Sequence, residues 1–155
     1  MIGWLLDTNV VSSLLNRNGA PSVKDWARSQ PEESLFISIL TIAEYDKGIY
    51  NLPDDHPDRS RHLASRDALL ERFADRILPV SDPIIRRWGM ISGTIKRRTK
   101  HFPSVIDTML AATAMEYDLF FTTRNIADVN HTGAALFNPW NDDPSNFPIG
   151  KGKRL

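Results

Sequence analysis

The first dozen residues of the chain place a carboxylate at the junction between a predicted strand and a predicted helix. Residues 2–6 form a mostly apolar run, Asp7 ends it, and apolar residues then recur with helical spacing from Val10. This pattern predicts a buried strand that leads directly into a helix. In a parallel α/β sheet the carboxyl ends of the strands form the edge at which ligands bind, which makes Asp7 a candidate functional residue. Asp7 could also serve simply as the N-cap of the helix.

Short apolar segments alternate with helical patterns along the rest of the chain. The sequence predicts strands at 35–38, 119–122 and 134–137, a short extended segment at 77–80, and helices at 9–16, 21–29, 39–50, 59–75, 83–99 and 104–115. Such alternation predicts βαβ crossovers and a parallel sheet with helices on both faces, which is an α/β fold. The helix-rich stretch 52–100 is then an insertion or a helical layer on that sheet. Within it, Leu63, Leu69, Leu70 and Phe73 are expected to face the core.

Composition bounds the class of protein. A chain of 155 residues suits a single domain, and its 19 basic and 19 acidic residues give a net charge of zero. No long-range field therefore attracts nucleic acid, and any such binding needs a local basic patch. The absence of cysteine excludes disulfides and thiolate metal sites. Because there is neither a signal-peptide pattern nor an apolar run near the ~20 residues of a membrane span, we expect a cytoplasmic protein without membrane contact.

Three further acids occupy positions that resemble that of Asp7. Glu44 lies in an apolar helix shortly after a predicted strand, Asp107 lies in the first turn of the most apolar helix, and Asp128 follows the strand at 119–122. In a doubly wound sheet such junctions converge on one crevice. Each acid also has a structural alternative as part of a capping pair. These pairs are Thr41 with Glu44, Ser104 with Asp107, and Asn125 with Asp128.

Several carboxylates in one crevice need a compensating charge. Two carboxylates ~5 Å apart repel each other by roughly 3 kcal/mol at an effective dielectric constant of ~20. A helix N-terminus returns only about 0.3–1 kcal/mol to each of them. Shared protons or a cation must therefore supply the rest. A set of oxygen ligands without cysteine or a nearby histidine favours Mg²⁺ or Mn²⁺ over zinc.

Four segments, taken together and in order, resemble the PIN-domain ribonucleases, and specifically the VapC-type toxins of toxin–antitoxin pairs. The segments are Leu5-Leu-Asp-Thr-Asn-Val10, Ser38-x-x-Thr-x-Ala-Glu44, Asp107-x-x-x-Ala-Ala-Thr-Ala114 and Thr123-Arg-Asn-x-x-Asp128. The closing Phe137-Asn-Pro-Trp140 is similar to the FitB-like branch of that group. The resemblance implies a Rossmann-like three-layer α/β/α fold with a central parallel sheet. It also implies a PIN-like nuclease domain over 1–140, followed by an irregular basic tail over 141–155.

The same resemblance implies an activity and a set of site residues. The activity is endonuclease cleavage of RNA that depends on Mg²⁺ or Mn²⁺. Asn9 and Thr123 are expected to hold carboxylates in place. The fourth acidic position is open between Asp128, which we favour, and Asn125, which would then be an oxygen ligand or an orienting group. The acids expected both to bind metal and to act in catalysis are Asp7, Glu44, Asp107 and Asp128.

A basic patch and two partner proteins complete the expectations. Lys96, Arg97, Arg98 and Lys100 form the densest basic segment, which could bind the RNA backbone or could simply end a helix, where basic residues are favoured. The resemblance implies a homodimer and a cognate antitoxin in addition to the RNA substrate. The tail residues 151–154 would add at most weak non-specific affinity for RNA.

Two other functions stay open on the sequence alone. The segment that begins at Asp7 also resembles the nucleophile strand of haloacid-dehalogenase-like phosphatases, although Asn9 stands where those enzymes carry a second Asp. The other alternative is a degenerate domain that binds RNA or a protein without catalysis. The presence of all four acids argues against a degenerate domain.

Overall fold

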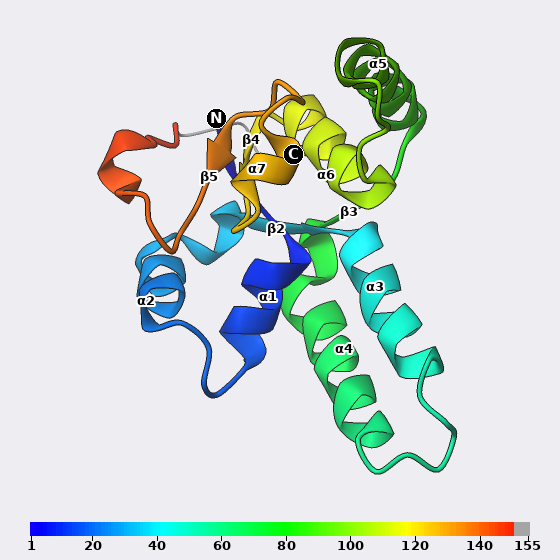
Figure 1. Ribbon diagram of the computed structural model, residues 1–155. Coiled ribbons are helices and arrows are strands. Elements are labelled where there is room, and N and C mark those ends of the chain that lie inside the picture. Colours follow the sequence, from blue (N-terminus) through cyan, green and yellow to red (C-terminus); the bar gives the residue numbers. More distant parts are fainter. Residues whose placement is uncertain (151–155) are drawn as a thin grey trace.

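The computed structural model describes residues 1–150, which contain a five-stranded sheet whose neighbouring strands are all parallel (Figure 1). The strands are β1 Gly3–Leu6, β2 Leu35–Ser38, β3 Ile77–Leu78, β4 Leu119–Thr122 and β5 Leu136–Phe137, in the sheet order β3-β2-β1-β4-β5. β1 lies at the centre of the sheet, and all four of its residues are buried. The chain passes from β1 through β2 to β3 on one side and then returns to β4 on the other. The carboxyl end of β1 therefore lies at the topological switch point, where α/β sheets bind ligands.

Helices connect the strands and cover both faces of the sheet, so the predicted three-layer α/β/α fold is confirmed. Trp4 and Leu6 of β1 belong to a core that also contains residues of the first, second and fourth helices. Leu5 belongs to a second core, with residues of the sixth and seventh helices. The two cores lie on opposite faces of the sheet, because successive strand residues point to opposite faces. The helices are α1 Thr8–Leu15, α2 Pro21–Ser29, α3 Ile39–Tyr50, α4 Arg59–Phe73, α5 Asp82–Thr99, α6 Val105–Glu116 and α7 Ile126–Val129. Short 3-10 turns lie at Glu32–Ser34, Ala74–Arg76 and Pro144–Asn146.

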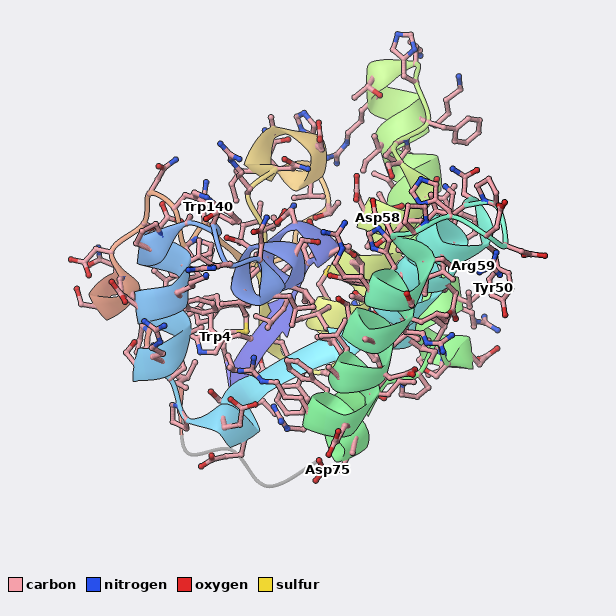
Figure 2. The ribbon with its side chains drawn as sticks, turned by 90° about the horizontal axis from the view of Figure 1, so that it is seen from below. Trp4, Tyr50, Asp58, Arg59, Asp75 and Trp140 are labelled. Carbon is pink, nitrogen blue, oxygen red and sulfur yellow. The ribbon has the colours of Figure 1, made fainter. Side chains whose placement is uncertain are left out.

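The helix-rich stretch 52–100 is a helical layer and not a separate insertion. α4 packs beside α3. Leu69 and Phe73 of α4 belong to the same hydrophobic core as Trp4 and Leu6 of β1. α5 packs against α6, on the side away from the sheet in Figure 1. The loop between α3 and α4 is held by Arg59, which donates to the carbonyl of Leu52 at 3.0 Å. The Arg59 guanidinium also lies over the ring of Tyr50, its neighbour in Figure 2.

Four of the predicted details differ from the structure. Leu70 is 39% exposed, because Leu69 and Phe73 already define the inner face of α4 and Leu70 lies about 100° around the helix from Leu69. α4 ends at Phe73 and continues as a 3-10 turn. Within the predicted extended segment 77–80, β3 covers only Ile77–Leu78, because its partner β2 ends at Ser38, which pairs with Leu78. β5 covers only Leu136–Phe137 of the predicted 134–137.

The chain after β5 is irregular, as predicted, but its described part packs onto the domain. Phe147 stacks edge-on against Phe120 and Phe137 at ring distances of 5.4 and 4.9 Å. The N–H of Gly150 donates to the carbonyl of Met1 at 2.9 Å. The predicted basic tail residues 151–154 lie outside the described residues, and the division of the chain at residue 140 stays a prediction.

Within residues 1–150, no helix combines the length and the apolar character that would let it cross a membrane.

Candidate acidic site at the carboxyl end of the sheet

Asp7 lies at the carboxyl end of β1 and is almost entirely buried, with 6% of its surface exposed. Its backbone N–H donates to the carbonyl of Thr122 at 2.9 Å, which continues the pairing of β1 with β4. Its side chain accepts the N–H of Thr8 at 2.7 Å, so Asp7 is also the N-cap of α1. The capping role and the place at the strand end are therefore compatible, and the cap fixes the direction of the carboxylate.

A network of polar side chains holds the Asp7 carboxylate. Thr123 Oγ1 and Asn9 Nδ2 each donate to Asp7 Oδ2 at 2.7 Å. Thr123 Oγ1 in turn accepts from Asn9 Nδ2 at 3.2 Å and from the backbone N–H of Asn125 at 3.0 Å. The backbone N–H of Arg124 donates to Asn9 Oδ1 at 3.2 Å. A carboxylate has about four acceptor positions, so the three donors to Asp7 leave one position for a further ligand.

The pKa of the Asp7 carboxyl depends on its burial, on its hydrogen bonds and on the charges of two other acids. Burial is the largest influence and raises the pKa of Asp7 above its ordinary value. The hydrogen bonds from Thr123 and from the Thr8 N–H oppose this rise in the pKa. The negative charges of Asp107 and Glu44 raise the pKa of Asp7 further. The charges of Glu44 and Asp107 therefore act on Asp7 although these residues lie far apart along the chain.

Glu44 lies on α3 and does not take part in the predicted capping box. The helix is capped by Ser38, whose hydroxyl accepts the N–H of Leu40 at 3.1 Å, so Glu44 lies beyond the first turn. Thr41, the predicted partner in that box, has a buried hydroxyl without a hydrogen-bond partner among residues 1–150. The Glu44 carboxylate instead accepts the hydroxyl of Thr8, the residue that follows Asp7. One turn of α1 thus orients two of the acids.

Tyr45 is a neighbour of this site that the sequence did not indicate. Its hydroxyl lies 3.3 Å from the hydroxyl of Ser12. Burial raises the pKa of Tyr45, the Ser12 hydrogen bond lowers it, and the charge of Glu44 raises it again. Tyr45 therefore stays a neutral hydroxyl beside Glu44 at neutral pH.

Asp107 lies in the first turn of α6, and its N–H donates to Ser104 Oγ at 3.4 Å, which is half of the predicted capping box. α6 contributes buried residues from Thr108 to Ala114, as its apolar sequence predicts. Asp128 lies on α7 and is exposed, and the side chain of Asn125 makes no cap hydrogen bond. Within residues 1–150, neither the Asp107 nor the Asp128 side chain forms a hydrogen bond or ion pair. Asp128 is also not among the groups that shift the pKa of Asp7.

The donor set fits a hard divalent cation in its chemistry, although no closed cage has formed. No three His, Asp or Glu side chains in the described part of the chain stand close enough to form a metal cluster. The groups at the strand end are all oxygen donors, the kind of ligand that Mg²⁺ and Mn²⁺ prefer. The charges of Glu44 and Asp107 already disfavour ionisation of Asp7, and a cation among these groups would relieve that repulsion.

The predicted basic patch divides into two parts. Lys96 Nζ donates to the carbonyl of Lys100 at 2.6 Å, and Lys100 Nζ donates to that of Arg97 at 3.3 Å. Lys100 adopts a left-handed conformation with φ 67° and ends α5. These two lysines therefore satisfy the end of the helix. Arg97 and Arg98 are exposed and form no ion pair within residues 1–150.

A doubly wound parallel sheet with acids at its switch point defines a ligand-binding α/β domain. Residues 4–127 match the family described as "PIN domain", so the chain belongs to the PIN-domain family, and the resemblance seen in the sequence is confirmed. Toxin FitB of Neisseria gonorrhoeae is 32% identical over 138 residues, which are 89% of this chain and 99% of that protein. VapC ribonuclease Y4jK of Sinorhizobium fredii is 27% identical over 136 residues, 88% of this chain and 96% of that protein.

Solved structures agree with this assignment. A structure of FitAB bound to an IR36 DNA fragment contains a chain with a TM-score of 0.78 and 28% identity, over 90% of this chain and 97% of that one. The crystal structure of FitAcB from Neisseria gonorrhoeae contains a chain with a TM-score of 0.75 and 30% identity, and the match covers 88% of this chain and 98% of that one. The phosphatase alternative has no support from these similarities. The amide of Asn9 has no proton to release near neutral pH and cannot act as a general acid; it donates a hydrogen bond to Asp7 instead.

Proposed function

We propose that this PIN-domain chain is an endoribonuclease that depends on Mg²⁺ or Mn²⁺ and acts as the toxin of a type II toxin–antitoxin pair. The observation that carries the proposal is the buried Asp7 at the end of β1, whose pKa is raised by burial and further by the charges of Asp107 and Glu44. Acids that repel one another at a ligand-binding edge are suited to a divalent cation. The similarity to proteins named toxin and VapC ribonuclease supports the same proposal.

In this proposal, the acids bind the metal and accept a proton. Asp7, Glu44 and Asp107 would hold the metal, with Asp128 as the fourth acid. When bound, the metal would supply Lewis acidity, which lowers the pKa of a ligand water and neutralises charge on the scissile phosphate. Asp107 and Asp128 have carboxylates without hydrogen bonds among the described residues, so either can accept the proton of the attacking water. In-line attack of that water on phosphorus breaks the bond to the 3′ oxygen and leaves a 5′-phosphate, while the 3′ oxygen takes a proton from solvent water and becomes a 3′-hydroxyl.

The remaining polar residues would position those acids. Asn9 and Thr123 hold one oxygen of Asp7, and Thr8 holds Glu44. Such fixed carboxylates need no reorganisation when a cation or substrate arrives. Asn125 would orient the loop, since its backbone N–H already contacts Thr123. The Arg97 and Arg98 side chains would attract the RNA backbone.

An RNA cleavage assay tests the proposal directly. Purified protein is incubated with a panel of tRNAs, rRNA fragments and mRNAs, with Mg²⁺ or with EDTA, and the product ends are determined. We expect cleavage only with the metal, and loss of at least a hundredfold in rate for Asp7→Asn and Asp107→Asn. Asp75→Asn is the matched control, because Asp75 is 93% exposed and lies at the far end of α4 (Figure 2). Undiminished activity of either site variant would reject the assignment, and failure to bind Mg²⁺ or Mn²⁺ in calorimetry would favour the inert domain.

The partner proteins are part of the same proposal. The relative FitB is named a toxin, and we propose a cognate antitoxin and a second copy of the chain as partners. Light scattering on the purified protein should give twice the chain mass of 17.6 kDa. Co-expression with the product of the neighbouring gene should yield a complex in which RNA cleavage is suppressed. A monomer that the neighbouring protein does not inhibit would contradict both expectations.

A further inference from the structure

Arg124 follows directly after the residue that holds Asp7, yet it makes no ion pair with any acid of the site. Its backbone N–H is fixed to Asn9 Oδ1 at 3.2 Å, while Thr123 donates to Asp7 at 2.7 Å. The side chain of Arg124 is exposed, and its guanidinium forms no ion pair or hydrogen bond within residues 1–150. Within the described part of the chain, the Arg124 guanidinium at the border of the acidic site therefore has all of its side-chain N–H groups free to bind a ligand.

The Arg124 guanidinium has an aromatic neighbour in place of a carboxylate. Its central carbon lies 5.3 Å from the centre of the Trp140 ring, within the range of a cation–π contact. A guanidinium that stacks on an aromatic ring keeps its edge of N–H groups free, and that edge matches two oxygens of a phosphate. The contact therefore restricts the side chain without occupying its donors.

Trp140 is itself held by a hydrogen-bonded turn attached to β5. The N–H of Trp140 donates to Asn138 Oδ1 at 3.0 Å, and the N–H of Asn138 donates to Asp142 Oδ2 at 2.7 Å. The N–H of Thr123 donates to the carbonyl of Phe137 at 3.0 Å, which joins this turn to the loop that carries Arg124. Figure 2 shows Trp140 on the opposite side of the molecule from Tyr50 and Arg59. The turn after β5 thus forms a fixed support for Arg124.

From this arrangement we propose that Arg124 binds a backbone phosphate of the RNA at the edge of the acidic site, and that Trp140 is its positioning residue. The inference rests on the proposed nuclease function and names a residue that brings the substrate to it. Because the chain has a net charge of zero, only a local cation can attract a polyanion to the site, and the negative charges near Asp7 make such a cation more necessary. Arg124 is the arginine that adjoins the network around Asp7.

The test measures RNA binding separately from cleavage. Fluorescence anisotropy follows a labelled single-stranded oligoribonucleotide bound to the Asp7→Asn protein with Mg²⁺ over a series of salt concentrations. We expect Arg124→Ala to weaken binding about tenfold and to reduce the slope of log K against log salt by about 0.7, the value for one phosphate contact on a single strand. Arg124→Lys should keep the slope and lose part of the affinity. Arg61→Ala, beside the α3–α4 loop, is the control and should change neither quantity.

The role of Trp140 has its own readout. Trp140→Leu keeps the charge of Arg124, so the salt slope should stay while the affinity falls about threefold. In the background with Asp7 intact, Arg124→Ala should raise KM with little change in kcat, as expected for lost substrate binding. Unchanged affinity and salt slope in Arg124→Ala, or an equal loss of affinity in Arg61→Ala, would overturn the inference about Arg124. In that case, cleavage of RNA by the wild type would still support the nuclease proposal. If the parent protein neither binds nor cleaves RNA, both proposals fall.

Discussion

Replacing Thr123 by valine should separate the hydrogen bond to Asp7 from the packing around it. Valine keeps the shape of threonine and removes the hydroxyl that donates to Asp7 Oδ2 at 2.7 Å. A hydrogen bond to a charged group contributes about 1.5–3 kcal/mol, and water cannot easily replace it at a carboxylate that is 6% exposed. Asn9 and Asn125 also lose an acceptor, although Asn125 is exposed and can bind water. We expect Thr123→Val to lower the free energy of unfolding by about 2–3 kcal/mol.

Thr122→Val is the matched control for this experiment. Thr122 is the preceding residue and is equally buried, but its hydroxyl has no hydrogen-bond partner among residues 1–150. Removing an unsatisfied hydroxyl is neutral or stabilising, so Thr122→Val should unfold at or above the wild-type temperature. Thr123→Val should unfold about 4–12 °C lower, at roughly 2–4 °C per kcal/mol for a chain of this size.

The measurement is urea or thermal unfolding of the metal-free proteins in EDTA at neutral pH, repeated in acid. The Thr123 hydrogen bond favours the ionised form of Asp7 and lowers its pKa, so the penalty of Thr123→Val should shrink as the pH falls and Asp7 becomes protonated. Equal losses in the two valine variants would show that the Thr123 hydrogen bond does not stabilise the fold. So would a loss at Thr123 that does not depend on pH.

The remaining predictions concern charge, packing and backbone. Burial raises the folded-state pKa of Asp7, so its contribution to stability is present in acid and lost as the pH rises; metal-free wild type should gain stability relative to Asp7→Asn as the pH falls. The Arg72 and Arg76 guanidinium groups lower the pKa of Glu32, so Glu32→Gln should cost up to about 1 kcal/mol at pH 7, discounted for solvent screening, and progressively less in acid urea titrations. A Cβ at Gly3 would lie 2.4 Å from the Ser34 carbonyl oxygen, so Gly3→Ala should lower the melting temperature, whereas Gly48→Ala, with open space in α3, should raise the free energy of unfolding by about 0.5–1 kcal/mol.

The sequence predicted the elements whose signals are local. The bounds of α2, α3, β2 and β4 agree with the prediction. Pro21 fits the first position of a helix, and Ser38 caps the next one. The place of Asp7 at the end of a central strand followed from the same kind of signal. Parallel pairing then followed from the alternation of strands and helices.

Contacts between distant residues were beyond the reach of spacing rules. Thr41 and Glu44 have the spacing of a capping box, but Ser38 caps the helix. The Glu44 carboxylate instead accepts a hydrogen bond from Thr8, 36 residues away along the chain. The support of Arg124 by Trp140 likewise depends on how the turn after β5 packs. Asp128 was favoured for the fourth acid while Asn125 stayed open, and Asp128 is not among the groups whose charge shifts the pKa of Asp7. Side-chain direction decides such cases, and the sequence alone does not give it.

We propose that Asp7, Glu44 and Asp107 together bind one divalent cation. Crystals soaked with Mn²⁺ can locate that ion, because the anomalous scattering of manganese identifies its position without reference to any assumed ligand. We expect an anomalous peak bounded by carboxylate oxygens of these three residues, and its loss in Asp7→Asn crystals. A peak elsewhere on the molecule, or none at saturating Mn²⁺, would show that these acids do not share a cation.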